Sequence, residues 1–195
     1  KLFRQKMTII SAHYKLIYVH LHKCGGTSIE KSFENVMTWQ DLIIGSTDFG
    51  EQNQSFYRDK FNLHKHNSAL ELKIIVGEEK WKKFKTFTTV RDPKTLYQSY
   101  YNWAASKIFW ASKNDETILK DWRIKIKNRD YEPNFLSWGA IQAYLETSNF
   151  SEFVKMSINQ SKLPGPLCDR LKNDNNQIII DRIYKLEKMH SAWNF

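Results

Sequence analysis

The sequence predicts an α/β protein in which helices alternate with the strands of a parallel sheet. Two apolar runs, at residues 15–21 and 85–90, each stop at a polar turn and lead into a stretch of helical character. Their β-branched and aromatic residues are typical of buried parallel strands. A third run at 177–184 adds a last strand. Helices on both faces of such a sheet give a three-layer α/β/α sandwich with a central parallel sheet.

The 195 residues predict a single domain over 1–195, because a chain of this length with 41% hydrophobic residues can bury a sizeable core. Caps and breakers place the other elements. We expect a short lead-in over 1–14, an ambiguous charged segment over 112–132, a mostly irregular stretch over 39–63, and helices over 27–38, 68–76, 78–84, 93–111, 133–146 and 151–161.

The first polar turn combines a lysine, two glycines and two hydroxyl residues: Lys23, Cys24, Gly25, Gly26, Thr27 and Ser28. Such a turn before a helix offers backbone N–H groups, the positive end of a helix dipole and an ammonium to one anion. Phosphate is the anion that this many donors suit best. The order differs from a Walker A loop, because Lys23 precedes the glycines instead of following them.

A second anion site is predicted where the run at 85–90 ends in Arg91-Asp92-Pro93. Pro93 suits the first turn of a helix, and Ser99 stands eight residues beyond Arg91. An arginine at the carboxyl end of a strand, with a serine on the next helix, can bind an oxyanion. Two such sites at one sheet edge predict a ligand that is phosphorylated at two separate positions.

This pair of motifs resembles the sulfotransferases that use 3′-phosphoadenosine 5′-phosphosulfate (PAPS). Their donor loop commonly reads Pro-Lys-Thr-Gly-Gly-Thr-Ser, and residues 22–28 are its counterpart. Their 3′-phosphate site commonly reads Val-Arg-Asn/Asp-Pro with a later serine, as in residues 90–93 with Ser99. Residues 66–81 and 181–187 are similar to segments of the carbohydrate-type branch, family 2. The resemblance runs from about residue 14 to 187.

The resemblance implies a P-loop-NTPase-like sulfotransferase fold, PAPS as co-substrate, 3′,5′-bisphosphoadenosine (PAP) as product, and no metal. It implies sulfuryl transfer to a hydroxyl or amine, with a carbohydrate as the expected acceptor. Lys23 would stand at the leaving phosphate, while His66 would be the base and His64 its alternate or a partner for the acceptor. This chain departs from the family pattern with His22 in place of proline, Cys24 in place of threonine and Leu96 in place of arginine.

Two other classes remain open from the residues alone. A nucleotide kinase of the P-loop type would need Walker A order and an aspartate for magnesium, which we do not find. A basic nucleic-acid module fits the net charge of +9 but does not need the Arg91 to Ser99 spacing. We therefore expect a nucleotide donor and no nucleic acid. A zinc site at His20, His22 and Cys24 lacks a fourth ligand, so we expect His20 to be a structural strand residue.

The location of the protein follows from its cysteines and its hydropathy. Cys24 lies in the donor loop and Cys168 far from it, so we expect no disulfide and a reducing compartment. No run approaches the ~20 apolar residues of a membrane span. We expect a cytoplasmic protein, with the Golgi lumen as the alternative for a trimmed catalytic domain. The end soon after Glu187 fits either a compact member or a chain trimmed at its C-terminus.

Overall fold

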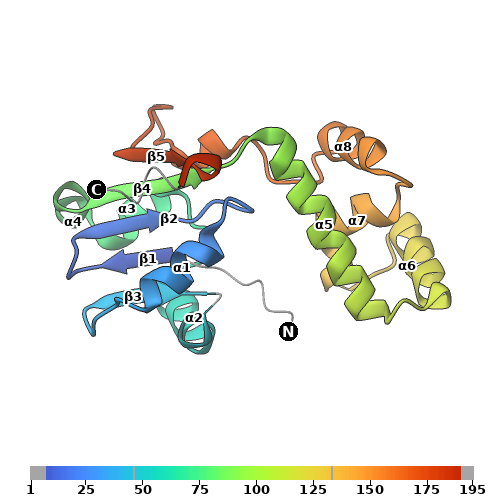
Figure 1. Cartoon of the computed structure of the whole chain (residues 1–195), viewed down its shortest axis with the longest axis horizontal. Coiled ribbons are helices and arrows are strands. Elements are labelled where there is room, and N and C mark those ends of the chain that lie inside the picture. The colour runs from blue at the N-terminus through green and yellow to red at the C-terminus, as the bar shows by residue number, and fades with distance from the viewer. Residues whose placement is uncertain (1–7, 46, 133, 190–195) are drawn as a thin grey trace. The chain divides into compact units, whose positions relative to one another are not determined.

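The structure is a computed structural model that describes residues 8–45, 47–132 and 134–189 (Figure 1). Its contacts divide the chain into two compact units, a helical unit and a sheet unit. The helical unit comprises Pro93–Gly165, and the sheet unit comprises the described residues before Pro93 and after Gly165. The single domain over 1–195 stays a prediction.

The sheet unit is built on five strands in the spatial order β3-β1-β2-β4-β5. Strands β2, β4 and β5 run parallel, while β1 is antiparallel to both of its neighbours. The bounds are β1 Thr8–Ser11, β2 Leu16–Val19, β3 Asp41–Ile44, β4 Lys85–Val90 and β5 Arg182–Lys185. The predicted strands at 15–21 and 85–90 are confirmed, and the last strand is shorter than the predicted 177–184.

The sheet is mixed, which corrects the predicted central parallel sheet. Residues 8–11 form β1 and not a lead-in, and residues 1–7 lie outside the described part of the chain. A turn of four residues joins β1 to β2, with Lys15 in the left-handed region at φ 53°. So short a connection can only join antiparallel strands. The run Thr-Ile-Ile-Ser is too short to stand out as a strand in the sequence.

Helices of the sheet unit are α1 Gly26–Glu34, α2 Asp48–Phe61, α3 Ala69–Val76 and α4 Glu78–Lys83, with 3₁₀ turns η2 Leu167–Leu171 and η3 Leu186–Lys188. The prediction of an irregular stretch over 39–63 is wrong, because it holds β3 and α2. Helix α2 is polar, so the apolar periodicity of its sequence is weak. The Thr47 side chain caps the N-terminus of α2, because it accepts a hydrogen bond from Gly50 N–H at 3.1 Å. The α/β class is confirmed; the three-layer sandwich and the P-loop-like fold stay predictions.

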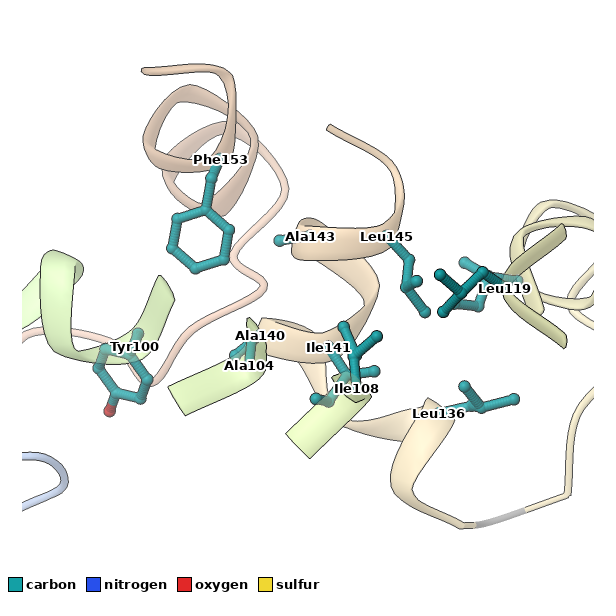
Figure 2. Packing of buried hydrophobic residues seen from close by; sticks show 11 residues of the cluster. Tyr100, Ala104, Ile108, Leu119, Leu136, Ala140, Ile141, Ala143, Leu145 and Phe153 are labelled. Carbon is teal, nitrogen blue, oxygen red and sulfur yellow. The ribbon is translucent and has the colours of Figure 1, made fainter. Parts of the chain in front are cut away.

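The helical unit packs α5 Pro93–Ser112, α6 Glu116–Asn128, η1 Phe135–Ser137, α7 Gly139–Leu145 and α8 Phe150–Asn159 around one apolar core. Figure 2 shows Phe153 of α8 and Ala143 of α7 approaching each other in this core. The ambiguous segment 112–132 contains α6. In the stretch predicted as helix over 133–146, residues 135–137 are a 3₁₀ turn and α7 begins only at Gly139; residue 133 lies outside the described residues.

Helix α1 is held on the sheet by an apolar cluster and a buried polar pair. Ile29 of α1 packs with Ile9, Tyr18 and Ile43 of three strands. One residue further, the Glu30 carboxyl lies 2.8 Å from Nδ1 of His20, and both side chains are almost fully buried. Burial raises the pKa of Glu30 to about 9 and lowers the pKa of His20 well below its usual value. The contact is therefore a neutral hydrogen bond near pH 7.

This pair predicts a pH-dependent stability difference between the wild type and Glu30→Gln. Because the pKa of Glu30 is raised in the folded state, its carboxyl contributes to the free energy of unfolding fully only below the unfolded pKa of about 4.3. This contribution is lost as the pH rises toward 9. Glutamine keeps the shape but does not ionise. Urea unfolding at pH 5, 7 and 9 should show the wild type losing stability relative to Glu30→Gln as pH rises.

Glu34→Gln is the matched control, because Glu34 lies one turn further along α1 and is partly exposed. Its stability should follow the wild type across the same pH range. Parallel pH profiles for the wild type and Glu30→Gln would show that Glu30 is ionised in the folded protein.

Candidate functional site

The loop between β2 and α1 turns sharply at two left-handed residues. Lys23 has φ 59°, and Gly25, the N-cap of α1, has φ 82°. The Thr89 hydroxyl of β4 donates to the Cys24 carbonyl at 2.7 Å, and because it has one hydrogen it accepts from the Tyr18 hydroxyl at 2.9 Å. These buried bonds fix the loop to the carboxyl ends of β2 and β4, the sheet edge that the sequence predicts for ligand binding.

Glycine is required at both loop positions. A Cβ on Gly26 would stand 2.2 Å from the His20 imidazole, so the backbone lies directly against that ring. A Cβ on Gly25 would stand 2.5 Å from Leu186 Cδ1, in addition to the strain of its positive φ. The sequence pattern Gly-Gly is thus explained by close approach of the loop to β2 and to η3.

The loop presents unpaired donors at the start of α1. The N–H groups of Ser28 and Ile29 donate to the Gly25 carbonyl at 3.0 and 3.3 Å. Within the described residues, the N–H groups of Gly25 and Gly26 have no hydrogen-bond acceptor. Thr27 and Ser28 are exposed on the first turn of the helix. Free N–H groups at a helix N-terminus can bind an anion, and the anion site predicted at this loop stays a prediction.

Arg91 joins this loop from the next strand. It directly follows β4, is half-buried, and donates from Nη1 to the Lys23 carbonyl at 3.3 Å. The next N–H, that of Asp92, donates to the Glu187 carboxylate at 2.9 Å. The structure therefore brings Lys23 and Arg91 together. Ser99 lies half-buried two turns into α5, in the helical unit, and its pairing with Arg91 stays a prediction.

His66 contacts the loop between β2 and α1, and its ring has one nitrogen that can accept a proton. Its Nδ1 lies 3.0 Å from the His20 carbonyl, and since a carbonyl only accepts, Nδ1 carries the proton. The neutral ring therefore has its lone pair on Nε2. Burial, with smaller contributions from His20 and His22, lowers the pKa of His66 well below its usual value. The ring is therefore neutral at neutral pH, with Nε2 unprotonated, which is the state that the predicted role as general base needs.

His64 has a different environment. Its Nε2 lies 2.7 Å from the Asn62 side-chain oxygen, and its backbone N–H donates to the side chain of buried Asn67. His66, in contrast, has ring contacts with two histidines, His20 at 4.7 Å and His22 at 3.4 Å between centroids. This geometry favours His66 over His64 as the base.

Two cations near His66 were missed by the sequence analysis. The Arg170 guanidinium of η2 donates to the His66 carbonyl and lies 3.8 Å from the Glu71 carboxylate of α3. Lys65 is buried beside His66, and burial lowers its pKa. Arg170 stands 104 residues beyond His66 in no recognisable pattern. Lys65 lies between His64 and His66 in the sequence, but no pattern indicates that it is buried.

Both cysteines of the chain are free thiols. Cys24 is a buried free thiol that donates to the His22 carbonyl at 3.3 Å, and burial raises its pKa to about 12. Cys168 is also a free thiol, and it is exposed. Over residues 8–45, 47–132 and 134–189, no set of three or more His, Cys, Asp or Glu side chains is arranged to hold a metal ion. Among the same residues, no helix is both long and apolar enough to span a bilayer.

Comparison with known proteins assigns the family. No curated protein and no solved structure matches the chain significantly. A model of the sulfotransferase family, family 2, matches residues 6–195, which takes in both units of the structure. The resemblance carried by the donor loop and by the Arg91 motif is thereby confirmed, and this chain belongs to the sulfotransferase family, whose members are transferases that move a sulfuryl group from a sulfate donor.

Proposed function

We propose that this sulfotransferase moves the sulfuryl group of PAPS to a hydroxyl or amine of an acceptor, which we expect to be a carbohydrate, and releases PAP. One juxtaposition carries the proposal: the unpaired N–H groups of Gly25 and Gly26 stand in the same loop whose His20 carbonyl holds the neutral base His66. An anion site and a base thus meet at one sheet edge. Neither group requires a metal.

The donor loop supplies the groups that sulfuryl transfer needs at the leaving phosphate. By analogy with phosphoryl transfer, the reaction is in-line, and negative charge builds on the bridging oxygen as its bond to sulfur breaks. The Gly25 and Gly26 N–H groups and the α1 dipole would hold the 5′-phosphate, together with Thr27 and Ser28. The Lys23 ammonium would bind the bridging oxygen, where a cation stabilises the transition state most.

His66 would take the proton of the attacking acceptor on Nε2. The Nδ1–H bond to the His20 carbonyl fixes the tautomer and strengthens as the ring becomes an imidazolium. Lys65 disfavours that positive charge in the free protein and lowers the pKa of His66, and Arg170 is a second cation, bonded to the His66 carbonyl. A bound phosphosulfate would offset these cations. The base therefore gains proton affinity only when the donor is in place.

Arg91 and Ser99 would bind the 3′-phosphate of PAPS. Support comes from the spacing of these residues and from the position of Arg91 against the donor loop. A P-loop kinase is less well supported, because Lys23 precedes the glycines and the family match covers the chain. The unpaired N–H groups of Gly25 and Gly26 suit one compact anion, so they do not support the alternative of a nucleic-acid-binding module.

Binding of PAP tests the donor site. PAP should bind at micromolar or tighter affinity without divalent metal, and more tightly than ATP or a single-stranded oligonucleotide. Replacing Arg91 with alanine removes a charge-assisted contact of about 2–3 kcal/mol, or roughly 30- to 150-fold in affinity. Calorimetry in the presence of EDTA measures both quantities.

Arg58→Ala is the charge-matched control, because its guanidinium is paired with the neighbouring Asp59. PAP affinity of this variant should equal that of the wild type. Equal affinity for Arg91→Ala, or tighter binding of ATP than of PAP, would contradict the proposed donor site.

Turnover of histidine and lysine variants tests the assigned roles. His66→Ala should lower kcat by roughly 10²- to 10⁴-fold with PAP affinity nearly unchanged, since a general base acts only on the chemical step. Lys23→Ala should weaken both PAP binding and kcat. His64→Ala should have a smaller effect, or act on the KM of the acceptor. Labelled PAPS with a panel of glycans and phenols provides the assay.

The comparison between the two histidines decides the base. Near-wild-type turnover of His66→Ala, together with loss of activity in His64→Ala, would move the role of base to His64. Loss of PAP binding in His66→Ala would instead place His66 in the donor site.

A further inference from the structure

The imidazole of His22 is stacked on the imidazole of His66. Their ring centroids lie 3.4 Å apart and their planes are tilted by 31°. The two residues come from different segments, His22 from the loop after β2 and His66 from the turn before α3. The resembling family commonly has proline at the position of His22, and proline carries no ring that could stack in this way. The contact is therefore a feature of this chain.

Three contacts restrain the His66 ring. Its Nδ1–H bond to the His20 carbonyl fixes one edge. The His20 ring meets it edge to face at 4.7 Å between centroids, and the His22 ring covers one of its faces. A hydrogen bond alone leaves the ring free to swing about the bonded atom, whereas a stacked ring fixes its plane. The direction of the Nε2 lone pair depends on that plane.

We propose that His22 is a positioning residue, whose ring fixes the plane of the His66 imidazole and shields it from water, so that Nε2 is held unprotonated and aimed at the acceptor. The inference rests on the proposed role of His66 as the base. It assigns His22 no proton transfer and no contact with the donor.

The charges around the pair agree with a shielding role. Lys65, Arg170 and Lys23 are the cations that act on these rings, and the Glu30 carboxyl is hydrogen-bonded to the neighbouring His20. Arg170 is further balanced by Glu71. Burial is nevertheless the largest cause of the lowered pKa at both rings, and it brings the pKa of His22 to about 4. His22 is thus neutral near pH 7, and it acts on His66 by covering the ring and not by its charge.

A pair of variants separates the covering ring from the imidazole nitrogens. His22→Ala removes the ring, and His22→Phe keeps a flat ring without a titrating group. The Cε1–H signal of His66 is followed by NMR between pH 4 and 8, in the full chain. His22→Ala should raise the pKa of His66 toward the usual value of about 6.5, because water reaches the ring. His22→Phe should leave it close to wild type.

Activity gives the second measurement. With a working acceptor, His22→Ala should lower kcat roughly tenfold to a hundredfold, with PAP affinity retained, because the base is misaligned. His22→Phe should restore kcat to within a few-fold of wild type. His13→Ala is the matched control, since His13 is exposed and packs on Tyr14, and it should change neither the His66 signal nor kcat.

Several outcomes would overturn the inference. One is a wild-type His66 that titrates near pH 6.5 or carries its proton on Nε2, which can be seen even if a variant fails to fold. Another is a His66 pKa and a kcat that do not change in His22→Ala. A third is an equal loss of kcat in the Ala and Phe variants, which would show that the imidazole nitrogens of His22 are needed. The NMR results require no acceptor, so a failure of PAP to bind the wild type would overturn the proposed function separately.

Discussion

The close approach of the donor loop to His20 is the constraint on which the site depends. The His20 ring lies against the backbone at Gly26 and is bonded to buried Glu30 of α1, while its carbonyl accepts from His66. One residue at the end of β2 therefore sets the start of α1, the path of the loop and the tautomer of the base. The bond between His20 and Glu30 is neutral, because burial lowers the pKa of His20 and raises that of Glu30.

The site combines fixed cations with neutral histidines. Lys23 and Arg91 lie together in the loop region, and Lys65 and Arg170 lie beside His66. The net charge of +9 indicated an anionic partner without saying where it binds. We propose that the anion binds at the unpaired N–H groups of Gly25 and Gly26. A base surrounded by cations stays unprotonated until an anion arrives, so that the proposed donor would both fill the site and activate its base.

The parts of the fold that were predicted are those with local signals. An apolar run followed by the Gly-Gly turn predicted β2 and α1, and an apolar run followed by Arg-Asp-Pro predicted β4 and α5. The strand Thr8–Ser11 is too short to show a period, and α2 is too polar, so both were missed although the sheet and the Thr47 cap stabilise them. Arg170 was missed for a different reason: its contact with His66 joins segments that only tertiary structure brings together.

The most direct test of the account is an amide map of PAP binding. In ¹⁵N-labelled protein, the Gly25 and Gly26 N–H groups have no acceptor within the described residues, so a bound 5′-phosphate should become their partner. Saturation with PAP in EDTA should shift both amide proton signals strongly downfield, and should raise the pKa of His66 by adding negative charge nearby. Saturable PAP binding that leaves both amides unchanged would contradict the assignment of this loop as the donor site.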